Sequence, residues 1–248
     1  MNEVSDLLGL NRNISDRGNG LEEAMKKLQL SEVERKGIKV PKTRELMLRP
    51  GEWHAVGLAL ADKPIFVEGI HQTLGKIWCP DKGMIVKEMG DNIFLFYFNQ
   101  LCGMKRALED GPWTAGHSLL VMAAYDARKD IDAMEFTHIP IWIRVGKLPM
   151  GMMNRVMGEI IGNEVGKFLD VDVDESGTAA GRYLRIKVSM DIRVPIMRGV
   201  TLEIEDEGGD LRWCPLEYEF LPELCYSCGI IGHIDKNCKK GAQTLKTD

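Results

Sequence analysis

Long hydrophobic runs are missing from this sequence of 248 residues. The longest apolar runs, at 93–98 and 119–125, fall far short of the roughly 20 residues that a membrane-spanning helix needs. No apolar stretch follows Met1, so no secretory signal is expected. These absences predict a soluble, intracellular protein without a membrane partner, and they leave nucleus and cytoplasm equally open.

A disulfide framework is also missing. Three of the six cysteines lie close together near the C-terminus, between 225 and 238. The other three are scattered and odd in number, which is a poor basis for disulfide pairing: Cys79, Cys102 and Cys214. We therefore expect reduced thiols, in agreement with an intracellular location.

Catalytic motifs are absent as well. The sequence has no phosphate-binding glycine loop, no Ser-His-Asp order and no HExxH. The aspartates in DVDVDE at 170–175 invite comparison with a calcium loop, but Glu175 and Gly181 stand where that loop needs Gly and Glu. Four histidines are isolated: His54, His71, His117 and His138. We expect no enzyme, no catalytic residue and no small-molecule substrate.

The charge balance argues against a general polyanion binder, since the net charge is −5. Charge is uneven, however: 182–198 holds five basic residues and one acidic residue, while 200–223 holds eight acidic residues and one basic residue. Arg185 and Lys187 have the same strand parity and should point to one side. We predict nucleic-acid phosphate contact for this pair, with a solvated surface as the alternative.

With 44% hydrophobic residues, the chain can bury a core. We expect disorder over 1–20, a helix over 21–30 and a capping box from Ser31 to Glu34. Hydrophobic periodicity then predicts strand, helix, strand, strand, helix and strand, at 54–62, 65–78, 83–90, 92–99, 103–111 and 117–125. This β-α-β-β-α-β order is typical of α+β, ferredoxin-like folds, which include the RNA-recognition-motif (RRM-like) architecture.

The faces of this first sheet argue against base reading. Phe94, Phe96 and Phe98 share one face and should pack on the helices, leaving Ile93, Leu95 and Tyr97 opposite. The first strand has no aromatic residue that could stack a base. A strand that is apolar on both faces favours a buried scaffold. The first helix should bury the residues at helical spacing, Phe66, Ile70, Leu74 and Ile77.

A second mixed α/β half follows a charged link. We expect a strand at 139–149, then a helix at 152–166 with Met153, Val156 and Ile160 on one side and glycines that loosen its end. Four more strands are predicted at 167–175, 182–191, 199–206 and 211–220. We hypothesise that this half closes over the open face of the first sheet. The predicted organisation is 1–44 N-terminal segment, 45–130 RRM-like domain, 131–222 second half, 223–240 knuckle and 241–248 tail.

The strongest motif is CYSCGIIGHIDKNC, in which Cys225, Cys228, His233 and Cys238 have the spacing C-x2-C-x4-H-x4-C. Thiolate and imidazole are the ligands of structural zinc, and four protein ligands leave no open coordination position. Gly229 and Gly232 supply the sharp turns that so short a loop needs. We predict one structural Zn²⁺, whose binding and the folding of a loop without its own core are one event.

Residues beside these ligands are candidates for nucleic-acid binding. Tyr226 and Ile234 could form a cleft that stacks one unpaired base, and the alternative for Tyr226, packing on the knuckle, is compatible with that role. Three lysines are the candidate phosphate partners: Lys236, Lys239 and Lys240.

The stretch EYEFLPELCYSCGIIGHIDKNC, with ALEDGPW, IPIWIRVGKLP and YLRIKVSMDIRVPIMRG, resembles a family of plant retrotransposon-derived proteins. These are similar to the gag-like first-reading-frame proteins of LINE-type elements and carry a conserved domain of unknown function before a CCHC zinc knuckle. The resemblance spans about 45–238. It implies zinc and nucleic-acid binding and no enzymatic activity.

We therefore expect a zinc-dependent binder of single-stranded RNA or DNA, with RNA preferred and a chaperone-like role. The alternative is a knuckle module for protein interaction or self-association without direct nucleic-acid readout.

Overall fold

The computed structural model describes residues 31–39, 53–204 and 210–238. The chain divides into two units, 1–46 and 47–248. In the first unit, helix α2 (Glu32–Arg35) begins with the predicted capping box: the Ser31 side chain accepts the Glu34 N–H, and the Glu34 carboxylate accepts the Ser31 N–H at 2.7 Å. The predicted disorder over 1–20 and helix over 21–30 lie outside the described residues.

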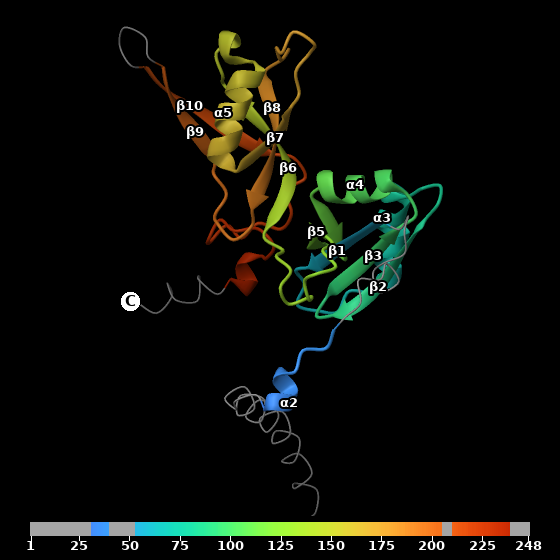
Figure 1. Ribbon diagram of the computed structural model, residues 1–248. Helices are drawn as coiled ribbons and strands as arrows, with labels where there is room; N and C mark the ends of the chain where they lie inside the picture. Colours follow the sequence, from blue (N-terminus) through green and yellow to red (C-terminus); the bar gives the residue numbers. More distant parts are fainter. Residues whose placement is uncertain (1–30, 40–52, 205–209, 239–248) are drawn as a thin grey trace, which may run out of the picture. The chain divides into compact units, whose positions relative to one another are not determined.

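The second unit begins with a five-stranded antiparallel sheet in the order β2-β3-β1-β5-β4 (Figure 1). Its elements are β1 (Trp53–Ala59), α3 (Val67–Trp78), β2 (Met84–Gly90), β3 (Ile93–Phe98), α4 (Leu101–Glu109), β4 (Trp113–Ala115) and β5 (Ser118–Ala124). The predicted element order is confirmed. Strand β4 was not predicted, because three residues are too few to show alternation.

The β2–β3 turn ties the sheet to the chain around it. Asp91 and Asn92 adopt left-handed backbone angles, with φ of 49° and 58°, which aspartate and asparagine tolerate better than most residues. The Asn92 side-chain amide also donates to the carbonyls of Ala61 and Lys63, both at 3.1 Å. The β2–β3 turn therefore also holds the connection between β1 and α3.

One face of this sheet carries the predicted phenylalanines. Phe94, Phe96 and Phe98 are buried in one core, and the rings of Phe96 and Phe98 lie against Trp78 of α3. The predicted face of α3 is right for Ile70 and Leu74 but wrong at its ends. Phe66 is exposed because α3 begins after it, and Ile77 is exposed because the buried stripe continues from Leu74 to Trp78, one full turn on.

The opposite face offers no open platform at its centre. Val56 and Leu95 are buried there, and Tyr97 lies against His54 and below the Lys87 ammonium. Leu119 and Val121 of β5 belong to the core of the second half. The expected closure of the second half over this face therefore holds at β5, whereas Ile85 on the edge strand β2 remains exposed.

The second half forms another five-stranded antiparallel sheet, in the order β7-β8-β6-β10-β9. Its strands are β6 (His138–Gly146), β7 (Lys167–Val171), β8 (Tyr183–Asp191), β9 (Gly199–Ile204) and β10 (Asp210–Tyr218), and each was predicted. A 3-10 turn, η2 (Met150–Met152), precedes helix α5 (Arg155–Val165), which packs across β7 and β8 (Figure 1).

Helix α5 buries a different face from the predicted one. Val156 and Ile160 share one side, but that side faces solvent, and Met153 precedes the helix. The buried positions are Gly158, Ile161 and Gly162. A Cβ on Gly158 would lie 2.9 Å from Cγ2 of Val171, and one on Gly162 would lie 2.7 Å from Cδ2 of Phe168. The glycines therefore bring the helix close to the sheet.

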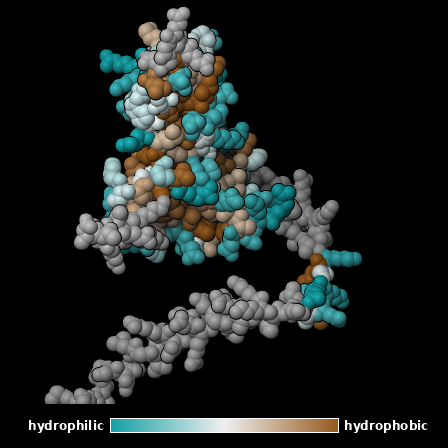
Figure 2. All heavy atoms as spheres, turned by 90° about the vertical axis from the view of Figure 1, so that its left-hand side faces the viewer, coloured by the Kyte–Doolittle hydropathy of each residue, from teal (hydrophilic) through white to brown (hydrophobic). Residues whose placement is uncertain are grey.

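Apolar side chains also lie at the surface. Figure 2 shows one face of the molecule, on which hydrophobic residues are interspersed with hydrophilic ones. In the described part of the chain, no helix combines the length and the hydrophobicity that crossing a membrane requires.

Candidate metal centre and nucleic-acid interface

Four side chains near the C-terminus converge as the spacing predicts. One ligand atom from each of Cys225, Cys228, His233 and Cys238 lies within 4.8 Å of the others. The Cys228 Sγ and His233 Nε2 atoms are 3.4 Å apart. The Gly229 N–H donates to the Cys225 carbonyl at 2.8 Å and closes the first turn, and the 3-10 turn η3 (Asp235–Asn237) leads into Cys238.

Both predicted glycine turns are present. Gly229 and Gly232 have φ of 74° and 88°, a region that other residues rarely adopt. Both glycines are also closely packed, since a Cβ on Gly229 would lie 3.1 Å from Pro195 and one on Gly232 would lie 2.9 Å from Leu60. A side chain at either position would be unfavourable for two reasons: the positive φ of the backbone and the close contact with the neighbouring residue.

The donor set fits zinc. In a tetrahedral site, metal–sulfur and metal–nitrogen distances of about 2.3 and 2.0 Å place sulfur and nitrogen about 3.5 Å apart. The Cys228–His233 separation of 3.4 Å agrees with that geometry. Three thiols and one imidazole favour a soft or borderline ion over calcium or magnesium. Burial raises the pKa of the Cys225 thiol to about 11, and a coordinated cation would favour the thiolate instead.

Asp235 organises the same loop, and sequence reasoning missed it. Its carboxylate accepts the Ser227 N–H at 2.7 Å and the Ser227 hydroxyl at 2.6 Å, and it lies 3.4 Å from the Tyr226 nitrogen. The bond from Ser227 lowers the pKa of Asp235. These contacts join residues eight and nine positions apart, which is outside any local capping pattern, so only the folded loop reveals them.

The knuckle is not a free-standing loop. Ile231 is 3% exposed and belongs to the core of the second half, together with Leu119 of β5. The Ile196 N–H donates to the Gly229 carbonyl at 2.8 Å, and the Asn237 side chain bonds to Asp62 at 2.7 Å. The loop has no core of its own, as expected, but Ile231 anchors it in the core of the second half, and the coupling of its folding to zinc stays a prediction.

The predicted base-stacking residues are accessible. Tyr226 is 86% exposed and Ile234 is partly exposed beside the metal loop, so Tyr226 does not pack inside the knuckle. Lys236 is exposed, whereas Lys239 and Lys240 lie outside the described residues. Contact of these residues with nucleic acid stays a prediction.

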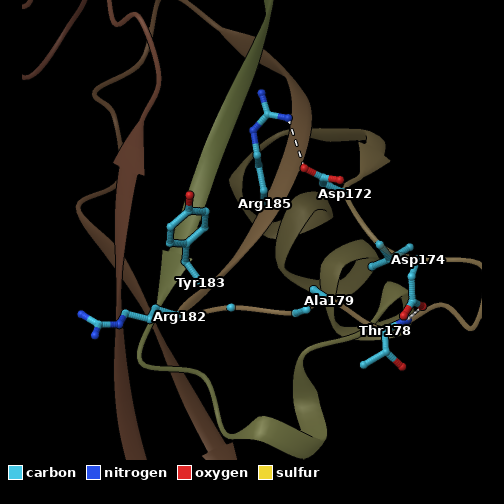
Figure 3. A pocket seen from close by; sticks show the side chains of 10 residues that line it. Asp172, Asp174, Thr178, Ala179, Arg182, Tyr183 and Arg185 are labelled. Carbon is cyan, nitrogen blue, oxygen red and sulfur yellow. Dashed lines mark hydrogen bonds and ion pairs between the residues drawn. The ribbon is translucent and has the colours of Figure 1, made fainter.

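Arg185 and Lys187 share a face, as their parity predicted, but both have carboxylate partners within the protein. Arg185 forms two bonds to Glu219, at 3.0 and 2.9 Å, and one to Asp172 at 3.4 Å, which Figure 3 shows. Lys187 bonds to Asp110 at 3.2 Å. The pKa of Arg185 is raised by its bond to Glu219. Phosphate contact by these cations stays a prediction, and their geometry favours a structural role.

Aromatic partners of these cations were also missed. The Arg185 guanidinium carbon lies 3.9 Å from the Trp142 ring centroid, and that of Arg144 lies 4.9 Å from the Tyr183 ring centroid. Trp142 and Arg144 alternate with buried aliphatic residues in IPIWIRVG, and this alternation was the available signal.

Comparison with solved structures finds the first two RRM domains of yeast poly(U) binding protein. The identity is 11%, the TM-score is 0.20, and the alignment covers 66% of this chain and 98% of that chain. A likeness at this TM-score does not define a shared fold. No curated protein matches the chain.

Family models match two segments of the sequence. The first is a domain of unknown function (DUF4283) over residues 43–132, and the second is a zinc knuckle over residues 190–240. The knuckle match and the converging cysteines and histidine together indicate a metal site of the zinc type. The chain contains a DUF4283 domain followed by a zinc knuckle, which is the architecture that the resemblance implied.

Proposed function

We propose that this protein binds single-stranded nucleic acid, RNA in preference to DNA, through a zinc-loaded knuckle. The observation that carries the proposal is the convergence of three cysteines and one histidine under an exposed tyrosine, Tyr226. The zinc-knuckle match supports nucleic-acid binding in general. A flexible basic loop would not need ligands at tetrahedral separations.

Each residue of the loop has a distinct part in this proposal. Four protein ligands leave the ion no open position, so zinc would supply a fixed loop and no reaction. Tyr226 offers a ring for stacking an unpaired base, Ile234 offers an apolar wall, and Lys236 offers a cation for phosphate. Asp235 holds the backbone under Tyr226 in place. The proposed role is therefore binding of nucleic acid without catalysis.

The proposal has three finer parts. They are derivation from a plant LINE-type retrotransposon, a chaperone-like action on nucleic acid, and an intracellular location. The DUF4283 and zinc-knuckle order supports the first of these.

A second candidate function is a protein-interaction or self-association module. The observation that favours it is the solvent-facing side of α5, where Val156 and Ile160 lie one turn apart and are mostly exposed. Contiguous exposed apolar residues of this kind are typical of interfaces.

A titration of fluorescently labelled RNA tests the leading proposal. The full chain is loaded with zinc and titrated with an unstructured single strand, with and without a chelator, at two salt concentrations. Matched single-stranded DNA and duplex RNA measure the preference. We expect binding that needs zinc, weakens with salt and favours the single strand. Equal binding after chelation would exclude the knuckle as the site, and absence of binding at any salt would exclude the function.

A further inference from the structure

Among the described residues, no helix packs across the middle of one face of the second sheet. Helix α5 packs on one side, and the opposite side carries alternate residues of the central strands β8, β6 and β10. Register pairs Tyr183 with Gly146 and Arg185 with Arg144 on that side. We call this surface the open face and define it by Trp142, Arg144, Tyr183, Arg185 and Trp213.

Planar groups are layered on the open face. Arg185 lies over Trp142, and Arg144 lies over Tyr183. The carboxylate of Glu219, only 9% exposed, bonds to both guanidiniums and fixes their planes. A guanidinium group is planar, and when one of its faces lies on an aromatic ring, the other face points outward. Such a face can stack on a base as an aromatic ring does.

Small residues lie between the exposed rings. Gly146 packs against Pro215, and Pro215 pairs with Gly199. The Trp213 ring lies so close to Gly199 that no side chain would fit there. Tyr183 is 40% exposed and Trp213 is 49% exposed on either side of this low strip. The open face therefore offers two accessible rings with a shallow floor between them.

Hollows lie at both ends of β8. One of about 520 Å³ is lined by Tyr183, Arg185, Asp172 and the residues that precede β8. Figure 3 shows Arg185 turned toward Asp172, with Arg182 pointing away at the start of the strand. The other, of about 540 Å³, includes Lys187 and Ser189. A strand of nucleic acid that follows β8 would have room at both ends.

We propose that the open face is a second binding site for single-stranded nucleic acid, which takes unpaired bases on Tyr183 and Trp213 and on the outward guanidinium planes. The proposal rests on the proposed function for its ligand class, but it names a different site. Two guanidiniums share the Glu219 carboxylate, and Asp172 and Glu217 lie at the margin. Stacking therefore contributes more than phosphate attraction, and the contribution of this face should persist at high salt.

Several features favour nucleic acid over a peptide on this face. The middle of β8 pairs with β6 on one side and with β7 on the other, so it offers no free edge for strand addition. The surface presents rings and guanidinium planes over a floor of glycine and proline, with no deep apolar groove among the described pockets. Flat groups of this kind suit bases, since every base has a π-face.

Alanine variants of the two exposed rings test the proposal. Affinity for a labelled, unstructured RNA is measured by fluorescence anisotropy on the zinc-loaded full chain, at low and at high salt. We expect Tyr183→Ala and Trp213→Ala each to weaken binding by about fivefold to a hundredfold, and Tyr183→Phe to retain most of it. Ile77→Ala, at an exposed apolar residue of α3 in the first half, is the control and should change nothing.

The outcomes separate the two sites. If both ring variants bind as wild type while chelation abolishes binding, the open face is not a site and the knuckle proposal stands. If the ring variants lose affinity and chelation has no effect, the open face is a site and the knuckle is not. RNA that carries 4-thiouridine should crosslink to β8, and crosslinks confined to the knuckle would overturn the inference. If the ring variants instead lose a protein partner and bind RNA normally, the face is a protein interface.

Discussion

Arg185 illustrates how far residue-level reasoning reaches. Strand parity places it correctly on one side with Lys187. Its carboxylate partner, Glu219, lies 34 residues away in the sequence and just after β10, which β6 separates from β8. No local pattern connects the two residues. The sequence therefore shows a basic strand, whereas the fold shows a guanidinium fixed between a carboxylate and the Trp142 ring.

Tyr226 yields the first residue-scale prediction. The Tyr226 ring is exposed, and the contact of this residue with Asp235 is made by its backbone nitrogen. Tyr226→Ala should weaken RNA binding by about fivefold to a hundredfold, because one stacked base is lost, and it should leave one zinc per chain. Anisotropy and metal analysis measure the two effects, with Tyr226→Phe as the control. Loss of zinc in the alanine variant would show that the tyrosine is structural.

Glu219 yields a prediction for stability. Its bonds to Arg185 and Arg144 lower its pKa, so the folded carboxyl stays ionised to lower pH than in the unfolded chain. The stabilisation is complete above the unfolded pKa of 4.5 and is lost as the pH falls below that value through the folded pKa. Glu219→Gln should lower the free energy of unfolding at pH 7 by about 1 to 3 kcal/mol.

Urea titrations at pH 7 and at pH 3 measure this effect. The difference between wild type and Glu219→Gln should shrink at the lower pH, because pH 3 lies below the unfolded pKa of 4.5, where the unfolded carboxyl gains a proton and part of the stabilisation is lost. Glu217→Gln, at an exposed carboxylate of β10 two residues before Glu219, is the control and should be near neutral. An equal difference at both pH values would rule out the ion pair as the cause.

At the scale of elements, periodicity predicts most of the structure. Each expected strand of both sheets is present, since alternation and turn residues are local signals. The face of α5 is the clearest error. Large apolar residues favoured the Val156 and Ile160 side, but the sheet selects Gly158 and Gly162, whose missing side chains allow close approach. A hydrophobic pattern alone does not predict that glycine, which has no side chain, lies at the closest contact between helix and sheet.

Gly158→Ala tests that explanation. An added methyl would lie 2.9 Å from Cγ2 and 3.3 Å from Cβ of buried Val171, and a β-branched strand residue cannot easily turn away. The variant should lose about 1 to 3 kcal/mol in the free energy of unfolding, even though alanine has a higher helix propensity than glycine. Gly69→Ala on α3 has nothing within 4 Å of the new methyl and should gain up to about 1 kcal/mol. Equal gains at both glycines would show that α5 has space for a methyl group.

For the whole molecule, the anchoring of the knuckle has a measurable consequence. Ile231 shares a core with Leu119, so loss of zinc should loosen more than the metal loop. Hydrogen exchange by NMR with and without a chelator tests this. The Leu60 amide, bonded to the Leu119 carbonyl at 2.8 Å, should exchange faster after chelation, whereas the amide of Phe96 in the inner strand β3 should change less. Unchanged exchange at Leu60 would mean that the knuckle opens independently.

The sequence by itself determined the metal ligands' spacing, the order of strands and helices, and the face that the phenylalanines occupy. These are local properties, because spacing, alternation and turn residues act over a few positions. Tertiary structure alone decided three things: the neutralisation of Arg185, the anchoring of Ile231 in a shared core and the open face of the second sheet. Each of them joins residues that are distant in the chain, and only packing determines which distant residues meet.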